Sequence, residues 1–271
     1  MAEIQLTDEG KKRMYWASVG VSVKEGFAAH QQSGQLDKGP DSWRNVTEHC
    51  LVEVARAEIL AKWIGLPEDV ILDIKMGSVL HDFDKKEEII VTKQADANGQ
   101  SPLIMARDVH EKDEALLKGD GFSARVRKLA ASAGGDTPQL IEAQEILNKY
   151  DLSDDDWAYL LVHYVDDCSI RSDWVKPVSV DRDGRRVNII DYRAEENKDK
   201  PTYRKISEEI GKDLRGTPFE GMNNHDAMTV VSHQIEKRLA QRILARTGEA
   251  VDPLEIPELV DQKIRENIGK M

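Results

Sequence analysis

Three short stretches of this 271-residue chain carry side chains that can bind a metal ion. His49 stands alone, His81 and Asp82 are adjacent, and Asp166 and Asp167 form an acidic pair further along the chain. Each residue alone has an ordinary structural explanation, as a buried histidine, a helix end or an ion-pair partner. Together, two imidazoles and two carboxylates form a mixed donor set that suits Mn, Mg, Fe, Co or Zn and leaves positions for water. We therefore expect a divalent metal site and hydrolytic chemistry.

The helices that hydrophobic periodicity predicts would bring these residues together. Apolar residues recur at spacings of three and four over 42–64, and His49 borders that buried face. A second helix, starting after Pro67, carries Val70 and Ile74 on one line with His81. His81 should therefore point inward near the end of its helix.

The acidic pair belongs to a third predicted helix. Ser153 and Asp156 stand at the separation of a capping box and mark the start of this helix. Asp166 falls on the same inner line as Val162, where an acid is costly unless it is paired or bound to a metal. This argument favours Asp166 over Asp167 as the ligand.

Most of the remaining chain is also expected to be helical. Turn and cap signals predict helices over 7–30, 103–118, 123–133, 138–150, 200–214, 224–247 and 253–269, with loops over 33–40 and 92–102. Alternating residues around Asp183-Gly184 predict a β-hairpin over 178–190. The predicted fold class is all-α with a small β-hairpin. Residues 1–175 would form the domain that carries the motifs, and 176–271 a hairpin and C-terminal helical extension packed on the same domain.

Composition limits the classes of partner. The net charge is −12, and no cluster of Lys and Arg is present, so a nucleic acid polymer or an anionic membrane is not expected to be the partner. The N-terminus has no signal-peptide pattern and no apolar run reaches 18 residues, which predicts a cytoplasmic protein. Only two cysteines occur, and reduced thiols are expected. A homo-oligomer is left open.

The order and spacing of the candidate ligands resemble the signature of the HD-domain metal-dependent phosphohydrolases. The segment Arg44-Asn-Val-Thr-Glu-His49-Cys resembles the first motif, Leu80-His-Asp-Phe-Asp-Lys85 the second, and Tyr164-Val-Asp166-Asp-Cys-Ser the third. The resemblance covers residues 40 to 175. It implies an HD-domain helical bundle and a metal ion held by His49, His81, Asp82 and Asp166. A bound water would be the nucleophile on a small phosphorylated substrate, with a nucleotide as the family precedent.

The resemblance also assigns a role to Lys85. His81 to Lys85 is the His-Asp-X-X-Lys version of the motif, in which the lysine faces the substrate phosphate. A cation one turn from a metal ligand can stabilise the charge that develops on phosphoryl oxygens, by about 2–4 kcal/mol for one well-placed group. Asp82 and Lys85 are therefore the expected catalytic residues, with Asp82 also a ligand.

Other polar residues near the motifs are weaker candidates. Binuclear relatives carry two further histidines; His110 is placed like the first, and no histidine occurs over 129–135 where the second is expected. This departure favours a single metal, with His110 on the substrate side. Arg44 and Arg171 flank the motifs and are candidates for substrate binding. His163 and Asp167 are candidates for residues that contact the metal ligands and orient them.

Two alternative functions stay open from the sequence. A minority of HD-domain proteins hold two irons and use oxygen, although such a diiron oxygenase needs more ligands than the motifs supply. The chain is also compatible with a non-catalytic regulatory module that binds a metal or a nucleotide without turnover. The C-terminal region outside the resemblance would supply a partner interface or a lid.

Overall fold

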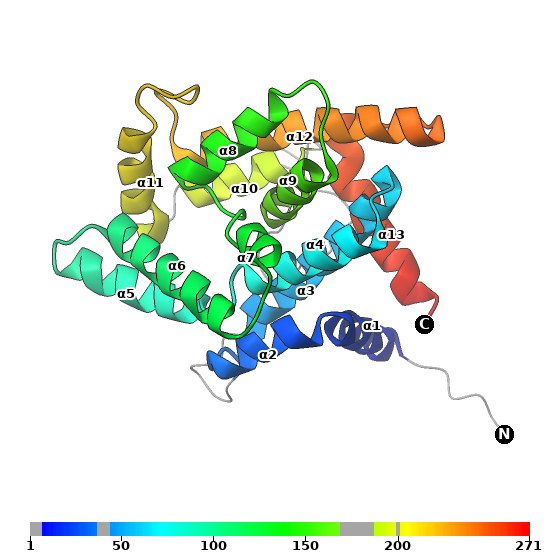
Figure 1. The fold of residues 1–271 in the computed structure, drawn as a ribbon, viewed down its shortest axis with the longest axis horizontal. Helices are drawn as coiled ribbons and strands as arrows, with labels where there is room; N and C mark the ends of the chain where they lie inside the picture. The colour runs from blue at the N-terminus through cyan, green and yellow to red at the C-terminus, as the bar shows by residue number, and fades with distance from the viewer. Residues whose placement is uncertain (1–6, 37–43, 169–186, 199–200) are drawn as a thin grey trace.

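All regular elements that the computed structural model describes are helices (Figure 1). The described residues are 7–36, 44–168, 187–198 and 201–271, and no strand occurs among them. In chain order the helices are α1 (Asp8–Ser22), α2 (Lys24–Gln32), α3 (Arg44–Ile64), α4 (Glu68–Leu80), α5 (Lys85–Ala97), α6 (Pro102–Gly119), α7 (Ala124–Ala130), α8 (Thr137–Leu147), α9 (Asp154–Asp167), α10 (Ile189–Lys198), α11 (Pro201–Asp213), α12 (Asn224–Thr247), the 3-10 turn η1 (Pro253–Glu255) and α13 (Ile256–Gly269).

Helix α9 forms the centre of the molecule and packs against both α3 and α4. Every residue from Asp156 to Asp167 is buried, so this helix is enclosed on all sides. The predicted capping box at its start is confirmed, because Ser153 and Asp156 satisfy each other's backbone amides. The end of this enclosed helix is therefore a place where an acidic side chain must find a positive partner.

The main hydrophobic core joins the first and last thirds of the chain. Ala57 and Leu60 of α3 belong to the same buried cluster as Leu239 of α12 and Val260 of α13. A second cluster seats α1 and α2 on the other side of α3 and α4. In Figure 1, α12 and α13 lie close to the central helices, and α5 and α6 form a hairpin at one side.

The predicted loop over 92–102 is wrong at its start. Helix α5 continues to Ala97, and the chain turns only at Asn98 and Gly99, where glycine adopts φ of 70°. The segment is rich in Lys, Glu, Gln and Ala, which are good helix formers. The loop therefore begins at Asn98-Gly99, later than the start at residue 92 that we expected from the sequence.

Two further expectations need correction. The single helix predicted over 7–30 is two helices, because Val23 leaves the helical region at φ −130° and ψ 34°. Ile189 and Ile190, placed at the end of the predicted β-hairpin, lie in α10. Val187 and Asn188 are not in a strand, and residues 178–186 of that hairpin fall outside the described residues. By contrast, the helix predicted over 224–247 is confirmed to the residue, with Asn223 as its cap.

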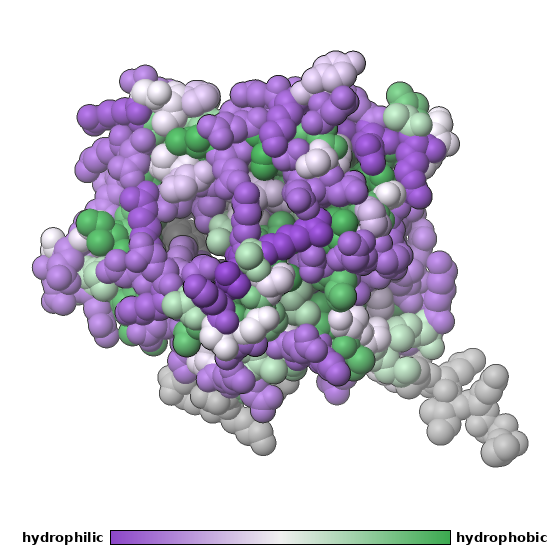
Figure 2. Space-filling view, in the orientation of Figure 1, coloured by the Kyte–Doolittle hydropathy of each residue, from purple (hydrophilic) through white to green (hydrophobic). Residues whose placement is uncertain are grey.

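Hydrophilic residues dominate the face of the molecule drawn in Figure 2, and hydrophobic residues occur there only in small groups. None of the described helices combines the length and apolarity needed to cross a bilayer.

Candidate metal centre

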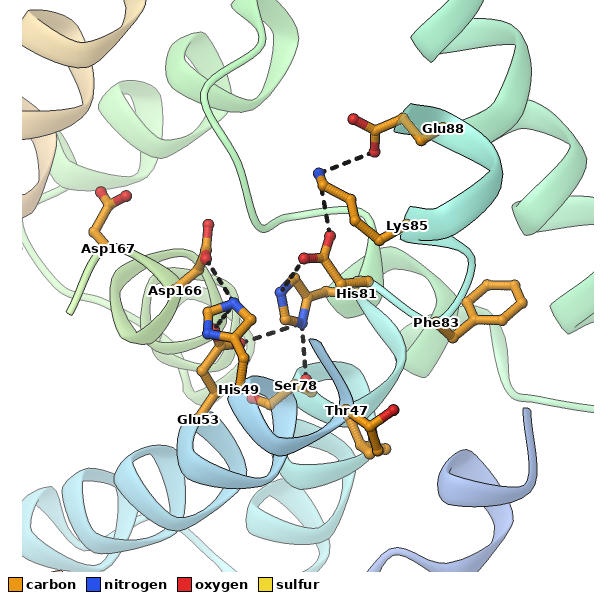
Figure 3. Close-up of polar contacts among 12 residues, drawn as sticks. Thr47, His49, Glu53, Ser78, His81, Phe83, Lys85, Glu88, Asp166 and Asp167 are labelled. Atoms are coloured by element: carbon orange, nitrogen blue, oxygen red, sulfur yellow. Dashed lines mark hydrogen bonds and ion pairs between the residues drawn. The ribbon is translucent and has the colours of Figure 1, made fainter. Parts of the chain in front are cut away.

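Four side chains from three helices converge where α9 ends (Figure 3). His49 and Glu53 lie one turn apart on α3, His81 follows the last turn of α4, and Asp166 lies in the last turn of α9. One ligand atom from each of them falls within 4.8 Å of all the others. The structure thus brings together three of the predicted ligands and adds Glu53, which the sequence interpretation had missed.

Glu53 is fully buried and lies between the two imidazoles. Its carboxylate oxygens are 2.6 Å from His49 Nε2 and 3.2 Å from His81 Nδ1. A signal for it existed in the sequence, since Glu53 shares the inner line of α3 with Cys50 and Ala57, both 0% exposed. The argument that selected Asp166, an acid on an apolar line, therefore applies equally to Glu53.

The donor atoms of this cluster fit a divalent cation. Neither oxygen of Glu53 accepts a hydrogen bond of normal geometry, and the buried Nε2 of His81 has no hydrogen-bond partner among the described residues. His81 Nδ1 lies 2.9 Å from the carbonyl oxygen of Ser78 and 3.2 Å from Glu53, an arrangement that fixes the ring and leaves Nε2 on the side of Asp82. Buried polar atoms of this kind require a partner, and a metal ion would satisfy them together.

Asp82 lies beside the cluster rather than within it. Its Oδ2 is 3.6 Å from His81 Nε2, and its Oδ1 is 3.4 Å from Lys85 Nζ. Two ligands that share a metal ion at about 2.1 Å stand roughly 3.0–3.6 Å apart, so this separation is compatible with a shared ion. Burial disfavours the charged carboxylate, but Lys85 and His81 outweigh it and lower the pKa of Asp82 to about 2.

The carboxylates of the cluster raise the pKa of both of its imidazoles. Burial opposes the imidazolium of His49, but the carboxylates of Glu53 and Asp166 outweigh it and raise its pKa to about 10. Burial likewise opposes the charged form of His81, and Glu53 raises its pKa nonetheless. The buried carboxylates thus favour the protonated form of both imidazoles. The cluster therefore favours positive charge at its centre.

Lys85 begins a line of contacts that leads away from the cluster. Its Nζ is 3.0 Å from Glu88 Oε2, and the same oxygen is 3.3 Å from His110 Nε2. A cavity of about 410 Å³ is lined by Lys85, Glu88 and His110 together with His49 and His81. Lys85 and His110, predicted from the sequence as catalytic and substrate-side residues, thus share one cavity with the cluster.

Arg193 of α10 enters the site from the C-terminal part of the chain. Its Nη2 lies 3.2 Å from Asp166 Oδ1 and its Nη1 3.3 Å from Asp167 Oδ1. Burial opposes ionisation of Asp166, but Arg193 and His49 hold its pKa well below the usual range. Asp166 therefore contacts both His49 and Arg193, and no sequence motif had indicated the arginine.

Asp167 and His163 lie behind the cluster. Oδ2 of Asp167 accepts a hydrogen bond of 2.6 Å from Ser232 of α12, and Figure 3 shows its carboxylate apart from that of Asp166. Burial raises the pKa of Asp167. His163 is buried and its Nδ1 lies 2.9 Å from the carbonyl of Ser132. The structure thus favours Asp166 over Asp167 as the ligand.

The turn that carries His81 and Asp82 is held by the N-terminal helices. Gln35 donates a hydrogen bond of 2.7 Å to the carbonyl of Asp82, and Ser33 donates one of 2.6 Å to the carbonyl of Phe83. His30 donates one of 2.5 Å to the carbonyl of Val79. Burial lowers the pKa of His30 to about 4, so this ring is neutral. The bond from His30 satisfies a carbonyl in the last turn of α4, and the other two hold the turn that follows this helix.

The two arginines that the sequence suggested as phosphate ligands are not placed at the site. Arg44 is the first residue of α3, and its side chain is not among those described; Arg171 lies outside the described residues. No protein-family model, curated protein or solved structure matches this chain.

Proposed function

We propose that this protein is a metal-dependent phosphohydrolase that cleaves a phosphoester or phosphoanhydride bond of a small phosphorylated substrate, with a nucleotide as the first substrate to test. The observation that carries the proposal is the buried group of His49, Glu53, His81 and Asp166 beside a cavity that also contains Lys85. Two carboxylates enclosed in this way are costly unless cations balance them.

Each residue of the site has a role in the proposed reaction. A divalent ion held by the cluster would supply a water of lowered pKa and a Lewis-acid charge. Lys85 lines the cavity 3.4 Å from Asp82 and would stabilise the negative charge that develops on the phosphoryl oxygens. Asp82 would pass the proton of the attacking water to solvent. Arg193 would hold Asp166 in the orientation that a ligand needs.

The cavity has the size and lining of a site for a small molecule. Its volume of about 410 Å³ lies within the range of roughly 300–1,000 Å³ that is usual for ligand pockets. Beyond the charged residues its wall includes Leu103, Ile206, Ile210 and Met228. Such a wall supports a substrate with an apolar part, for example the base of a nucleotide.

The test is phosphate release from a panel of nucleotides and phosphomonoesters with Mn, Mg, Fe, Co or Zn. We expect one Mn²⁺ per chain by calorimetry and turnover of at least one substrate. Asp166→Asn should reduce turnover by about 100-fold or more, since a ligand of the cluster is lost. Asp154→Asn, at the exposed start of the same helix, is the matched control and should keep full activity.

Other results would identify the alternative functions. Two irons per chain with oxygen consumption and no phosphate release would support the diiron oxygenase. Tight nucleotide binding without turnover under any metal would support the regulatory module. Full activity of Asp166→Asn would contradict the metal centre itself.

A further inference from the structure

Glu88 and His110 form an imidazole and carboxylate pair on the cavity wall, on the far side of Lys85 from the cluster. Glu88 comes from α5 and His110 from α6, and the two helices pack side by side. Glu88 Oε2 is 3.3 Å from His110 Nε2, with side chains 14% and 48% exposed. The carboxylate is thus largely enclosed, while the imidazole is open to the cavity.

Successive contacts lead from Asp82 to Lys85, then to Glu88, then to His110, at 3.4, 3.0 and 3.3 Å. A phosphoryl group that lies against Lys85 would therefore have the cluster on one side and His110 on the other. In-line displacement at phosphorus needs this order, because the nucleophile and the leaving oxygen occupy opposite sides of the phosphoryl group.

On the basis of the function proposed above, we propose that His110, oriented by Glu88, donates the proton that the leaving oxygen takes up. The oxygen of the attacking water bonds to phosphorus, and the bond between phosphorus and the ester oxygen breaks. The electron pair of that bond remains on the ester oxygen, which takes the imidazolium proton of His110. The proton of the water passes to solvent, and His110 regains its own proton from solvent.

The groups around His110 favour its protonated form. Glu88 and Lys85 face it from α5, and Asp113 lies one turn away on its own helix, close to Asp84. Burial and Lys85 oppose the charge on the ring, but Glu88 and Asp113 outweigh them and raise the pKa of His110. Glu88 is thus a positioning residue, which holds one ring nitrogen and leaves the other for the substrate.

Two esters that differ in their need for a proton test this role. A nucleoside 5′-monophosphate releases an alcohol, whereas 2,4-dinitrophenyl phosphate releases a phenolate that needs no proton. Loss of a general acid costs about 10²–10⁴-fold where the leaving oxygen needs one. With Mn²⁺, His110→Gln should therefore lose about 100-fold or more in kcat on the nucleotide and less than about 5-fold on the aryl ester. Glu111→Gln, on the exposed side of α6, is the control and should match the wild type on both.

Glu88→Gln tests the positioning residue separately. The alkaline limb of its pH profile on the nucleotide should move to lower pH, because the imidazolium loses its stabilising carboxylate. The exposed neighbour Glu87→Gln should leave the limb in place. Affinity for Mn²⁺, measured by calorimetry, should be unchanged in both His110→Gln and Glu88→Gln.

The outcomes separate this inference from the proposed function. Equal losses on the two esters, or weaker Mn²⁺ binding by His110→Gln, would overturn the role of His110 while the hydrolase stands. A wild-type protein that binds Mn²⁺ and cleaves no nucleotide or phosphomonoester of the panel with any of the metals would overturn the proposed function and this inference together.

Discussion

Glu53 decides how the candidate metal centre balances its charge. It is 0% exposed and lies between His49 and His81, so its carboxylate has no access to water. A buried carboxylate is tolerated when positive charge lies next to it, and the protonated imidazoles of His49 and His81 or a bound cation can supply that charge. We therefore expect Glu53 to increase the affinity of the cluster for a cation, whether it binds the ion directly or orients His49.

Replacement of Glu53 tests this role. Glu53→Gln keeps the shape of the side chain but removes its charge, and we expect affinity for Mn²⁺ to fall by about 10- to 100-fold. Isothermal titration calorimetry measures the change, and Glu48→Gln, exposed on the same helix, serves as the control. Affinity equal to that of the wild type would show that Glu53 takes no part in holding the ion.

At the scale of elements, the contact between α10 and α12 holds Arg193 next to Asp166. His233 of α12 lies 2.9 Å from Asp191 of α10 and 2.7 Å from Glu236 of its own helix. Hydrogen bonds to these two carboxylates outweigh burial and raise the pKa of His233 to about 9. The charged imidazole thus attaches α10, and with it Arg193, to the core.

This attachment should make stability depend on pH. Because the folded state raises the pKa of His233, its contribution is complete below the unfolded value near 6.5 and is lost as the pH rises through about 9. We expect His233→Gln to lower the free energy of unfolding by about 1–2 kcal/mol at pH 6 and by much less at pH 10. Urea unfolding of both proteins at the two pH values measures this. If the free energies of unfolding of the two proteins differed by the same amount at pH 6 and pH 10, the charged His233 would not contribute to stability.

At the scale of the whole molecule, an ion pair inside the protein ties the C-terminal helix to the helix that carries the site. Arg56 of α3 bonds Asp261 of α13 through two nitrogens, at 2.8 and 3.0 Å, with side chains 2% and 9% exposed. Arg56 is less than one turn from Glu53. The C-terminal helices therefore support the helix that presents His49 and Glu53.

Breaking this pair should destabilise the entire fold rather than one end of it. Asp261→Asn removes the carboxylate that pairs with the buried charge of Arg56, a change that costs about 3 kcal/mol. Urea unfolding followed by circular dichroism should show one transition at lower urea, while the exposed Glu266→Gln of the same helix should unfold like the wild type. Separate transitions for α13 and the rest would show that the two parts are independent.

Local sequence signals were enough for much of the helical framework. The capping box of Ser153 and Asp156, and the cap at Asn223, act over three residues and can be recognised without knowledge of the rest of the fold. The break at Val23 was missed because no strong local stop signal marks it, and α5 was ended too early although its stop signal, Asn98-Gly99, is local. Helix boundaries at such places are decided by packing against other helices.

At the site, too, some features follow from local sequence signals and others from the packing of the helices. Helical phase alone predicted that His81 and Asp166 point inward, since it depends only on spacing along each helix. Which side chains meet across helices was decided by tertiary structure: Glu53 between the imidazoles, Glu88 between Lys85 and His110, and Arg193 against Asp166. Arg193 lies outside every motif, and α10 reaches Asp166 only because the C-terminal helices share the core with α3 and α9. Periodicity determines the face of a helix on which a residue lies, whereas the packing of the helices determines what that residue contacts.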